Sequence, residues 1–115
     1  MLKNKTTKKV LAKQVISFKT FLQIGIGLMF KTKKYCKNKA FLFHLNEKRK
    51  YSITMLFVFF ALDIIFLDKN MKVIEIKTNL KPFAHYKPKK RFSYMIEILH
   101  NKKKNVNVGD YLLIS

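Results

Sequence analysis

The chain has 115 residues, 49% of them hydrophobic, and a formal net charge of +19 from 25 Lys and Arg against 6 Asp and Glu. This length fits a single domain with one core, and this hydrophobic content excludes an intrinsically disordered chain. The chain has one cysteine, Cys36, so an intrachain disulfide is excluded and nothing points to an oxidising compartment. We expect one domain over residues 1–115, in which the basic residues 1–9 are a loosely held N-terminal segment.

The positive charge predicts attraction to polyanions such as nucleic acid or an anionic membrane. Lys supplies 23 of the basic residues and Arg only 2. The guanidinium fork of Arg is preferred for phosphate and base recognition, whereas Lys also makes a soluble surface. Non-specific polyanion binding and simple solvation therefore both stay open as interpretations.

A small hairpin is the first element that the sequence predicts, over residues 4–14, with Val10 and Ala12 on one face. Lys13 and Gln14 interrupt the apolar run here, and no small-residue cleavage site follows. A secretory signal is therefore not expected, and we predict a cytoplasmic protein.

A helix near residues 18–29 follows, with Ser17 as its N-cap and apolar residues at helical spacing. Gly25 and Gly27 lie near its end but lack the further residues of a dinucleotide or phosphate loop, so we assign them to helix packing or fraying. A basic loop over 31–39 comes next.

The most apolar stretch of the chain is residues 51–67, which contain a single acid, Asp63. Its apolar part is shorter than the roughly 20 residues of a spanning helix, and a central Asp is costly in a bilayer. Aromatic and β-branched residues favour strands instead. We predict two buried strands, near 53–60 and 63–67, with a bend between them and both sheet faces covered.

Short strands and turns fill the rest of the chain. Before the apolar stretch we predict a strand over 41–45 and a charged turn over 46–50. After it come a hairpin turn over 68–71, a strand over 73–77 with Ile74 and Ile76 on one face, and an aromatic loop between Pro82 and Pro88. The next strand has Phe92, Tyr94, Ile96 and Ile98 on one face and Ser93 and Glu97 on the other, and it is followed by a basic loop over 101–107, a Gly109-Asp110 turn and a strand over 111–114. The pattern predicts a mainly β domain, a small barrel or sandwich with one short helix in its N-terminal half.

One contiguous core is expected to include seven residues. They are Phe57, Phe59, Ile64, Phe66, Ile74, Tyr94 and Ile96.

Asp63 is the best single candidate for a site carboxylate, at the bend between two buried strands. The alternative is a structural Asp that accepts backbone N–H bonds at the bend. The histidines, His44, His85 and His100, show no ligand spacing, so we expect no metal and no cofactor, and His44 suits a strand better than a ligand set. No local catalytic motif is present.

Basic and aromatic residues are interleaved after Ala84, as they are in sites that bind single-stranded nucleic acid. The candidate contacts are Tyr86, Lys87, Lys89, Lys90 and Arg91, near Tyr94.

The order and spacing of several segments make the chain similar to uncharacterised protein family 0127, also called domain of unknown function 192, in its archaeal form. The residues that carry the resemblance are Asn4-Lys5-Thr6, Gly27-Leu28-Met29-Phe30-Lys31, Met55 to Phe60, Leu62 to Asp68 with Asp63, Val73 to Ile76, Lys81-Pro82-Phe83, Pro88-Lys89-Lys90, Tyr94 to Glu97 and Val108-Gly109-Asp110. The resemblance implies a compact β-rich barrel or sandwich with a short helix before its sheet, and no established activity.

The chain departs from the family at a few positions. Relatives usually have Pro where Ala61 stands, many have His where Thr54 stands, a Gly is common near Met71, and a Pro-Ala-Gly type of turn is replaced around 100–104. The missing His argues against a metal or acid–base role at that position.

Three classes of function stay open. The default is a small binding or accessory module with an undetermined partner. The alternatives are non-specific, salt-dependent nucleic-acid binding through a lysine-rich surface, and an enzyme with Asp63 in its site.

Overall fold

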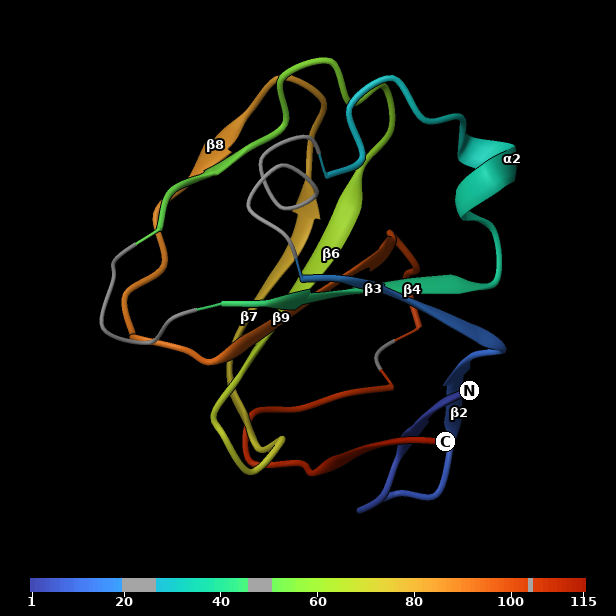
Figure 1. Cartoon of the computed structure of the whole chain (residues 1–115), viewed down its shortest axis with the longest axis vertical. Coiled ribbons are helices and arrows are strands. Elements are labelled where there is room, and N and C mark those ends of the chain that lie inside the picture. The colour runs from blue at the N-terminus through green and yellow to red at the C-terminus, as the bar shows by residue number, and fades with distance from the viewer. Residues whose placement is uncertain (20–26, 46–50, 104) are drawn as a thin grey trace.

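The computed structural model of the chain describes residues 1–19, 27–45, 51–103 and 105–115 (Figure 1). A five-stranded sheet forms its centre, in the order β3-β4-β9-β6-β7. Its strands are β3 (Gln14–Phe18), β4 (Lys39–His44), β9 (Tyr94–Leu99), β6 (Leu62–Leu67) and β7 (Val73–Leu80). The β3–β4 pair is parallel and the other pairs are antiparallel.

Two smaller sheets and one helix complete the described part of the chain. They are a three-stranded sheet of β10 (Leu112–Ile114), β1 (Leu2–Asn4) and β2 (Val10–Ala12), a two-stranded sheet of β5 (Ile53–Thr54) and β8 (His85–Tyr86), and the one-turn helix α2 (Lys33–Cys36). No helix within the described ranges is long and apolar enough to cross a membrane.

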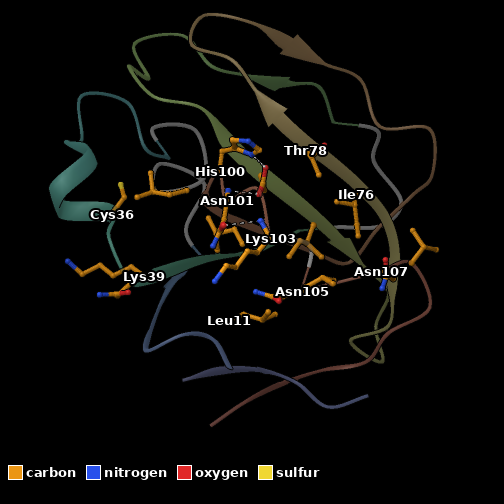
Figure 2. Close-up of a pocket in the computed structure, with 17 residues that line it drawn as sticks. Leu11, Cys36, Lys39, Ile76, Thr78, His100, Asn101, Lys103, Asn105 and Asn107 are labelled. Atoms are coloured by element: carbon orange, nitrogen blue, oxygen red, sulfur yellow. Dashed lines mark hydrogen bonds and ion pairs between the residues drawn. The ribbon is translucent and has the colours of Figure 1, made fainter. Parts of the chain in front are cut away.

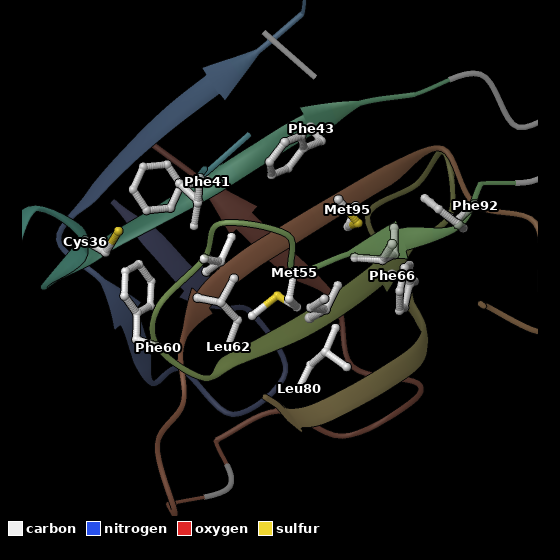
Figure 3. Close-up of a cluster of buried hydrophobic side chains, with 14 residues drawn as sticks. Cys36, Phe41, Phe43, Met55, Phe60, Leu62, Phe66, Leu80, Phe92 and Met95 are labelled. Carbon is white, nitrogen blue, oxygen red and sulfur yellow. The ribbon is translucent and has the colours of Figure 1, made fainter. Parts of the chain in front are cut away.

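Both faces of the central sheet are buried. Along β6, Leu62, Ile64 and Phe66 belong to a first cluster of buried side chains, shown in Figure 3. Ile65 and Leu67 belong to a second cluster on the other face, which also takes in Leu2, Ala12 and Leu112 from the three-stranded sheet. Every residue of β6 is buried, as its continuous apolar run predicted.

The predicted mainly β architecture is confirmed, and it is sandwich-like. The three-stranded sheet lies over the second cluster, while β5, β8 and their loops lie over the first. Among the described strands, β3 and β7 form open edges of the central sheet, so the sheet does not close into a barrel. Residues 1–9 were predicted to be a loosely held segment. They include β1, which is the middle strand of the three-stranded sheet and in which Leu2 and Asn4 are fully buried.

The predicted strand over 53–60 is wrong beyond its first two residues. After Thr54 the chain turns, with the Val58 N–H donating to the Met55 carbonyl at 3.0 Å. Phe57 lies at φ 55°, and Phe57 and Phe59 are 40% and 59% exposed. The prediction that Phe57 and Phe59 lie in the core is therefore wrong. The turn points both side chains outward although both residues have a high strand propensity.

The other five predicted core residues do pack in the interior, but in two clusters rather than one. Ile64, Phe66 and Ile74 join the first cluster, and Tyr94 and Ile96 join the second.

A bulge in β7 separates Ile74 from Ile76, which were expected on one face. Phe66 pairs with Glu75 and Leu67 with Val73, so Ile74 is an extra residue on its strand. Ile74 consequently packs in the first cluster and Ile76 in the second.

Phe92 was predicted to share one strand face with Tyr94, Ile96 and Ile98, and this is wrong. It lies before the start of β9 and packs in the first cluster, whereas the other three pack in the second. The strand's own alternation begins only at Tyr94.

The N-terminal half differs from the prediction in its helix. Ser17 lies inside β3 and is not an N-cap, and residues 20–26 of the predicted helix lie outside the described part. The described helix, α2, is instead within the predicted basic loop and is capped by Thr32, whose Oγ1 accepts from the Tyr35 N–H at 3.0 Å. The charged turn over 46–50 also lies outside the described residues.

The hairpin turn over 68–71 forms as predicted, and Met71 has a positive φ of 64°. Asp68 Oδ1 accepts the N–H groups of Asn70 and Lys72, at 2.8 and 3.0 Å. Met71 stands near the position where a Gly is common in the family, and Gly adopts this conformation at no steric cost.

Candidate functional site

A cavity of about 510 Å³ lies on the second-cluster side of the central sheet, toward the end of β6 where the chain enters it (Figure 2). Its walls come from β6, β7 and β9, from the segment 100–108 after β9, from Leu11 of β2, and from the connection between α2 and β4. The size is in the range of pockets that take small molecules.

Asp63 lies in the wall of this cavity, where β7 bulges opposite it. Leu62 pairs with Leu80 and Ile64 with Lys77, so two residues of β7 face the single residue Asp63. Asn79, at φ 52°, donates its backbone N–H to Asp63 Oδ1 at 2.8 Å. The bulge therefore provides the first donor that satisfies this buried carboxylate.

His100 provides the second donor. Its Nδ1 lies 2.8 Å from Asp63 Oδ1, and the backbone N–H of the next residue, Asn101, donates to Oδ2 at 3.1 Å. The backbone N–H of His100 also donates to the Ala61 carbonyl at 3.1 Å, which fixes the start of the loop. Asp63 thus binds neighbouring elements, whereas the sequence pointed to donors from its own bend.

The Asp63–His100 pair defines the imidazole tautomer. A carboxylate that already accepts two N–H bonds favours an Nδ1–H that donates to it. Nε2 is then the nitrogen left for a ligand, and within the described ranges no protein group bonds to it. The side chain of His100 keeps 28% of its surface exposed, so a ligand in the cavity can reach it.

Amide and amine side chains from the segment 100–108 form the rest of the polar wall. Asn101, Lys103, Asn105 and Asn107 line the cavity together with Thr78 of β7. Within the described residues, the side-chain amides of Asn105 and Asn107 make no hydrogen bond with the protein. These amides are available to a ligand as donors and acceptors.

Asn4 and Asp110 hold this segment in place. Asn4 Nδ2 donates to Asp110 Oδ2 at 2.8 Å and to the Asn105 carbonyl at 2.9 Å. Asp110 Oδ2 also accepts the Asn107 N–H at 2.9 Å. Because both side chains are buried, the cavity wall is tied to β1 and is preorganised.

A third buried acid, Glu97, lies on the opposite face of β9. Burial raises the pKa of Glu97 to about 7. Burial also raises the pKa of the Cys36 thiol to about 11, although nearby Lys39 and Lys31 lower this pKa; Glu97 raises it slightly further. Cys36 lines one end of the cavity.

The candidate nucleic-acid contacts do not line the cavity. The Tyr86 hydroxyl donates to Glu75, which also accepts the backbone N–H groups of Lys89 and Lys90. The Tyr86 ring lies 5.9 Å from the ring of Phe66. Burial and the Glu75 bond raise the pKa of Tyr86 to about 12. Tyr86 therefore holds this loop to β7, and base contacts by Lys87, Lys89, Lys90 and Arg91 stay a prediction.

The other histidines lie elsewhere in the fold. His44 is in β4, as the sequence indicated, against the ring of Tyr94 at 5.3 Å, and burial, with a smaller effect of Lys19, lowers its pKa. His85 is exposed in β8. In the ranges that the structure describes, no three His, Cys, Asp or Glu side chains gather in a way that could hold a metal ion.

The residues of the family resemblance are spread over the fold. Gly27 and Phe30 have positive φ in one turn, Leu28 and Met55 are buried in the first cluster, and Gly109 has φ 98° in the turn before Asp110. Met29 and Pro88 are half-buried, Lys31, Pro82 and Thr54 are exposed, and none of these five lines the cavity. Of the residues that carry the resemblance, Asp63, Ile65, Ile76 and Val108 line the cavity, and Asp110 supports it.

Sequence reasoning missed His100 as the partner of Asp63. The two are 37 positions apart, and only the antiparallel pairing of β6 with β9, with Asp63 opposite Ile98, brings them together. A polar residue directly after a buried strand, as His100 is, was the one available signal.

Comparison with known proteins identifies the family. The model of the DUF192 family, described as "Uncharacterized ACR", matches residues 2–114. A UPF0127 protein of Pyrococcus horikoshii is 38% identical over 78 residues, which are 68% of this chain and 65% of that protein. A UPF0127 protein of Pyrococcus furiosus is 32% identical over 111 residues, which are 95% of this chain and 93% of that protein.

The fold also occurs among solved structures. A crystal structure of a protein of unknown function from Novosphingobium aromaticivorans superposes with a TM-score of 0.77 at 21% identity, covering 87% of this chain and 74% of that one. The family match over nearly the whole chain, the archaeal relatives and the shared fold agree with the sequence resemblance. The chain belongs to the UPF0127 (DUF192) family, whose function is unknown.

Proposed function

We propose that this protein is a small binding module that holds a polar, anionic small molecule in the cavity beside Asp63 and His100. The observation that carries this proposal is the Asp63–His100 hydrogen bond of 2.8 Å in the wall of a cavity of about 510 Å³. A pair that leaves one imidazole nitrogen without a protein partner is an anchor for a hydrogen-bonding ligand.

The charges around the cavity favour an anion. Lys103 lines it together with His100, whereas Asp63, the one acid among its described lining residues, already accepts three hydrogen bonds from the protein. The unpaired amides of Asn105 and Asn107 suit hydroxyl, carboxylate or phosphate oxygens. Ile65, Ile76 and Ile98 supply an apolar floor for the carbon skeleton of the ligand.

We place this binding in the cytoplasm, the compartment that the sequence indicates, with one domain carrying the whole site. The single cysteine supports this location, because a chain with one cysteine forms no intrachain disulfide.

Thermal denaturation with a panel of phosphorylated sugars, nucleotides and organic acids tests the proposal. A ligand at 100 times its dissociation constant stabilises the folded state by about 2.7 kcal/mol, which is measurable as a rise in melting temperature. The rise should disappear in His100→Ala and persist in His85→Ala, a matched change at an exposed histidine outside the cavity. No stabilisation by any class of anion, or equal stabilisation of both variants, would contradict the proposal.

Acid–base chemistry on the bound molecule is a second candidate function. A carboxylate that fixes the Nδ1–H tautomer prepares Nε2 to take a proton, as an orienting Asp does in hydrolytic triads. Turnover of an identified ligand should then fall steeply in Asp63→Asn while ligand binding is retained. Unchanged turnover in that variant would remove this candidate.

A further inference from the structure

Three loops, residues 27–32, 55–61 and 81–84, meet at the end of the molecule that lies away from the chain termini (Figure 1). Four exposed phenylalanines lie on these loops. Phe30 is 68% exposed, Phe59 59%, Phe83 49% and Phe57 40%. We call these four residues the Phe cluster. Single exposed apolar residues are common on protein surfaces, but a contiguous group marks an interaction site.

The rings of the Phe cluster contact one another and form one apolar surface. Phe30 and Phe57 stack with ring centroids 4.7 Å apart, and Phe83 meets Phe57 and Phe59 edge-on at 6.3 and 5.5 Å. Backbone hydrogen bonds join the loops, from Phe30 N–H to the Phe57 carbonyl at 2.9 Å and from Phe83 N–H to the Met55 carbonyl at 3.0 Å. These hydrogen bonds hold the loops together and so fix the positions of the rings.

The backbone shows that these rings are held outward at a steric cost. Phe30, Phe57 and Phe83 have φ values of 63°, 55° and 63°, a region that Gly and Asn enter far more readily than Phe. The same loop buries Met55, Val58 and Phe60 in the first cluster. Burial of those three anchors the loop while Phe57 and Phe59 remain in solvent.

Positive charge surrounds the Phe cluster. Lys31, Lys33 and Lys34 follow Phe30 within four positions and are exposed, and Lys81 is exposed two positions before Phe83. The three loops that carry the Phe cluster, residues 27–32, 55–61 and 81–84, contain no acidic residue, and each of the five acids in the described ranges is buried or half-buried. They are Asp63, Asp68, Glu75, Glu97 and Asp110.

We propose that the Phe cluster and its flanking lysines dock this protein on an anionic lipid bilayer. Aromatic rings enter the boundary between headgroups and acyl chains, while lysines contact the anionic headgroups. A second copy of the chain fits this surface poorly, since two chains of charge +19 repel. Single-stranded nucleic acid fits it less well, because rings that already pack on one another are poor platforms for successive bases.

The absence of tryptophan from the chain allows a direct test. Phe59→Trp places a single reporter in the Phe cluster, and Tyr111→Trp, at a position 44% exposed beside β10, is the matched control. With vesicles of equal parts phosphatidylglycerol and phosphatidylcholine, we expect a blue shift of the Phe59→Trp emission. The control should not shift, and neither reporter should shift with vesicles of phosphatidylcholine alone.

Sedimentation with the same vesicles tests the apolar contribution. Phe30→Ser and, separately, Phe83→Ser should each lower vesicle affinity about tenfold or more. Leu113→Ser, which removes a side chain that is 47% exposed on β10, should leave it unchanged. Circular dichroism confirms the fold of each variant before comparison.

Three results would overturn the proposal. Equal blue shifts of both reporters, or parental affinity in both Phe variants, would show adsorption by charge alone. A shift of the Phe59→Trp emission with a single-stranded oligonucleotide but not with anionic vesicles would assign the surface to nucleic acid instead.

Discussion

The carboxylate of Asp63 and the imidazole of His100 are hydrogen-bonded at 2.8 Å although 37 positions separate them in the chain. Antiparallel pairing of β6 and β9 places Asp63 opposite Ile98, so the residue just after β9 reaches back to the carboxylate. The bond closes one wall of the cavity and orients the imidazole toward a ligand.

Replacement of Asp63 by Ala should destabilise the protein because it leaves three donors without their acceptor. The donors are the Asn79 N–H, His100 Nδ1 and the Asn101 N–H. An unsatisfied buried donor costs about 1–3 kcal/mol, and these three bonds are part-buried, so urea denaturation of Asp63→Ala should show a loss of about 2 kcal/mol. Asp63→Asn keeps one acceptor oxygen, so its free energy of unfolding should fall less than that of Asp63→Ala. If Asp63→Ala is as stable as the parent, the carboxylate has no structural role.

Glu97 should make stability fall as the pH rises from about 5 to neutrality. Burial raises the pKa of Glu97 from 4.5 to about 7, so the folded state binds a proton that the unfolded state has released between these values. Stability relative to Glu97→Gln should therefore decline from about pH 5 to about pH 7 and then level off, by about 3 kcal/mol in total. Denaturation of both proteins at several pH values measures this difference, and a constant difference would contradict it.

Phe66 and Phe59 form a matched pair that tests the observed core. Phe66 is fully buried in the first cluster, whereas Phe59 is 59% exposed. Phe66→Ala should cost about 3–5 kcal/mol of unfolding free energy. Phe59→Ala should cost no more than about 1 kcal/mol, since it loses mainly an edge contact with Phe83. The reverse order of the two losses would show that residues 55–60 form the buried strand that their sequence suggests.

The sequence alone predicted the strands whose hydrophobic pattern is compatible with only one arrangement in the sheet. The apolar run of β6 had to be covered on both faces, and the alternation from Tyr94 to Leu99 had to form β9. Residues 55–60 have the same strand propensity, but only a turn lets Met55 and Val58 reach the first cluster. That turn depends on contacts with Phe30 and Phe83, which no local pattern encodes.

The site was predictable only in part for the same reason. A lone acid in an apolar run marked Asp63, because a buried carboxylate needs partners. Its partners depend on the β7 bulge and on strand register, so the sequence could not identify Asn79 or His100.

Cys36 should react slowly with thiol reagents although it lines the cavity. The side chain is 1% exposed and its pKa is raised to about 11, so little thiolate forms at pH 8. Alkylation should be on the order of 100-fold slower than for an exposed cysteine. A variant with Cys36→Ala and Ser115→Cys supplies that reference at an exposed position. Equal rates for the two proteins would show that the thiol opens to solvent.

The most direct test of ligand binding at the Asp63–His100 pair is NMR of the imidazole C–H signals, since the chain has only three histidines. Inorganic phosphate, organic acids and sugar phosphates are titrated in turn. A bound anion should shift the His100 signal saturably and leave the signals of His44 and His85 in place. Titrations in which no anion moves the His100 signal, or in which all three histidines shift alike, would contradict binding at this pair.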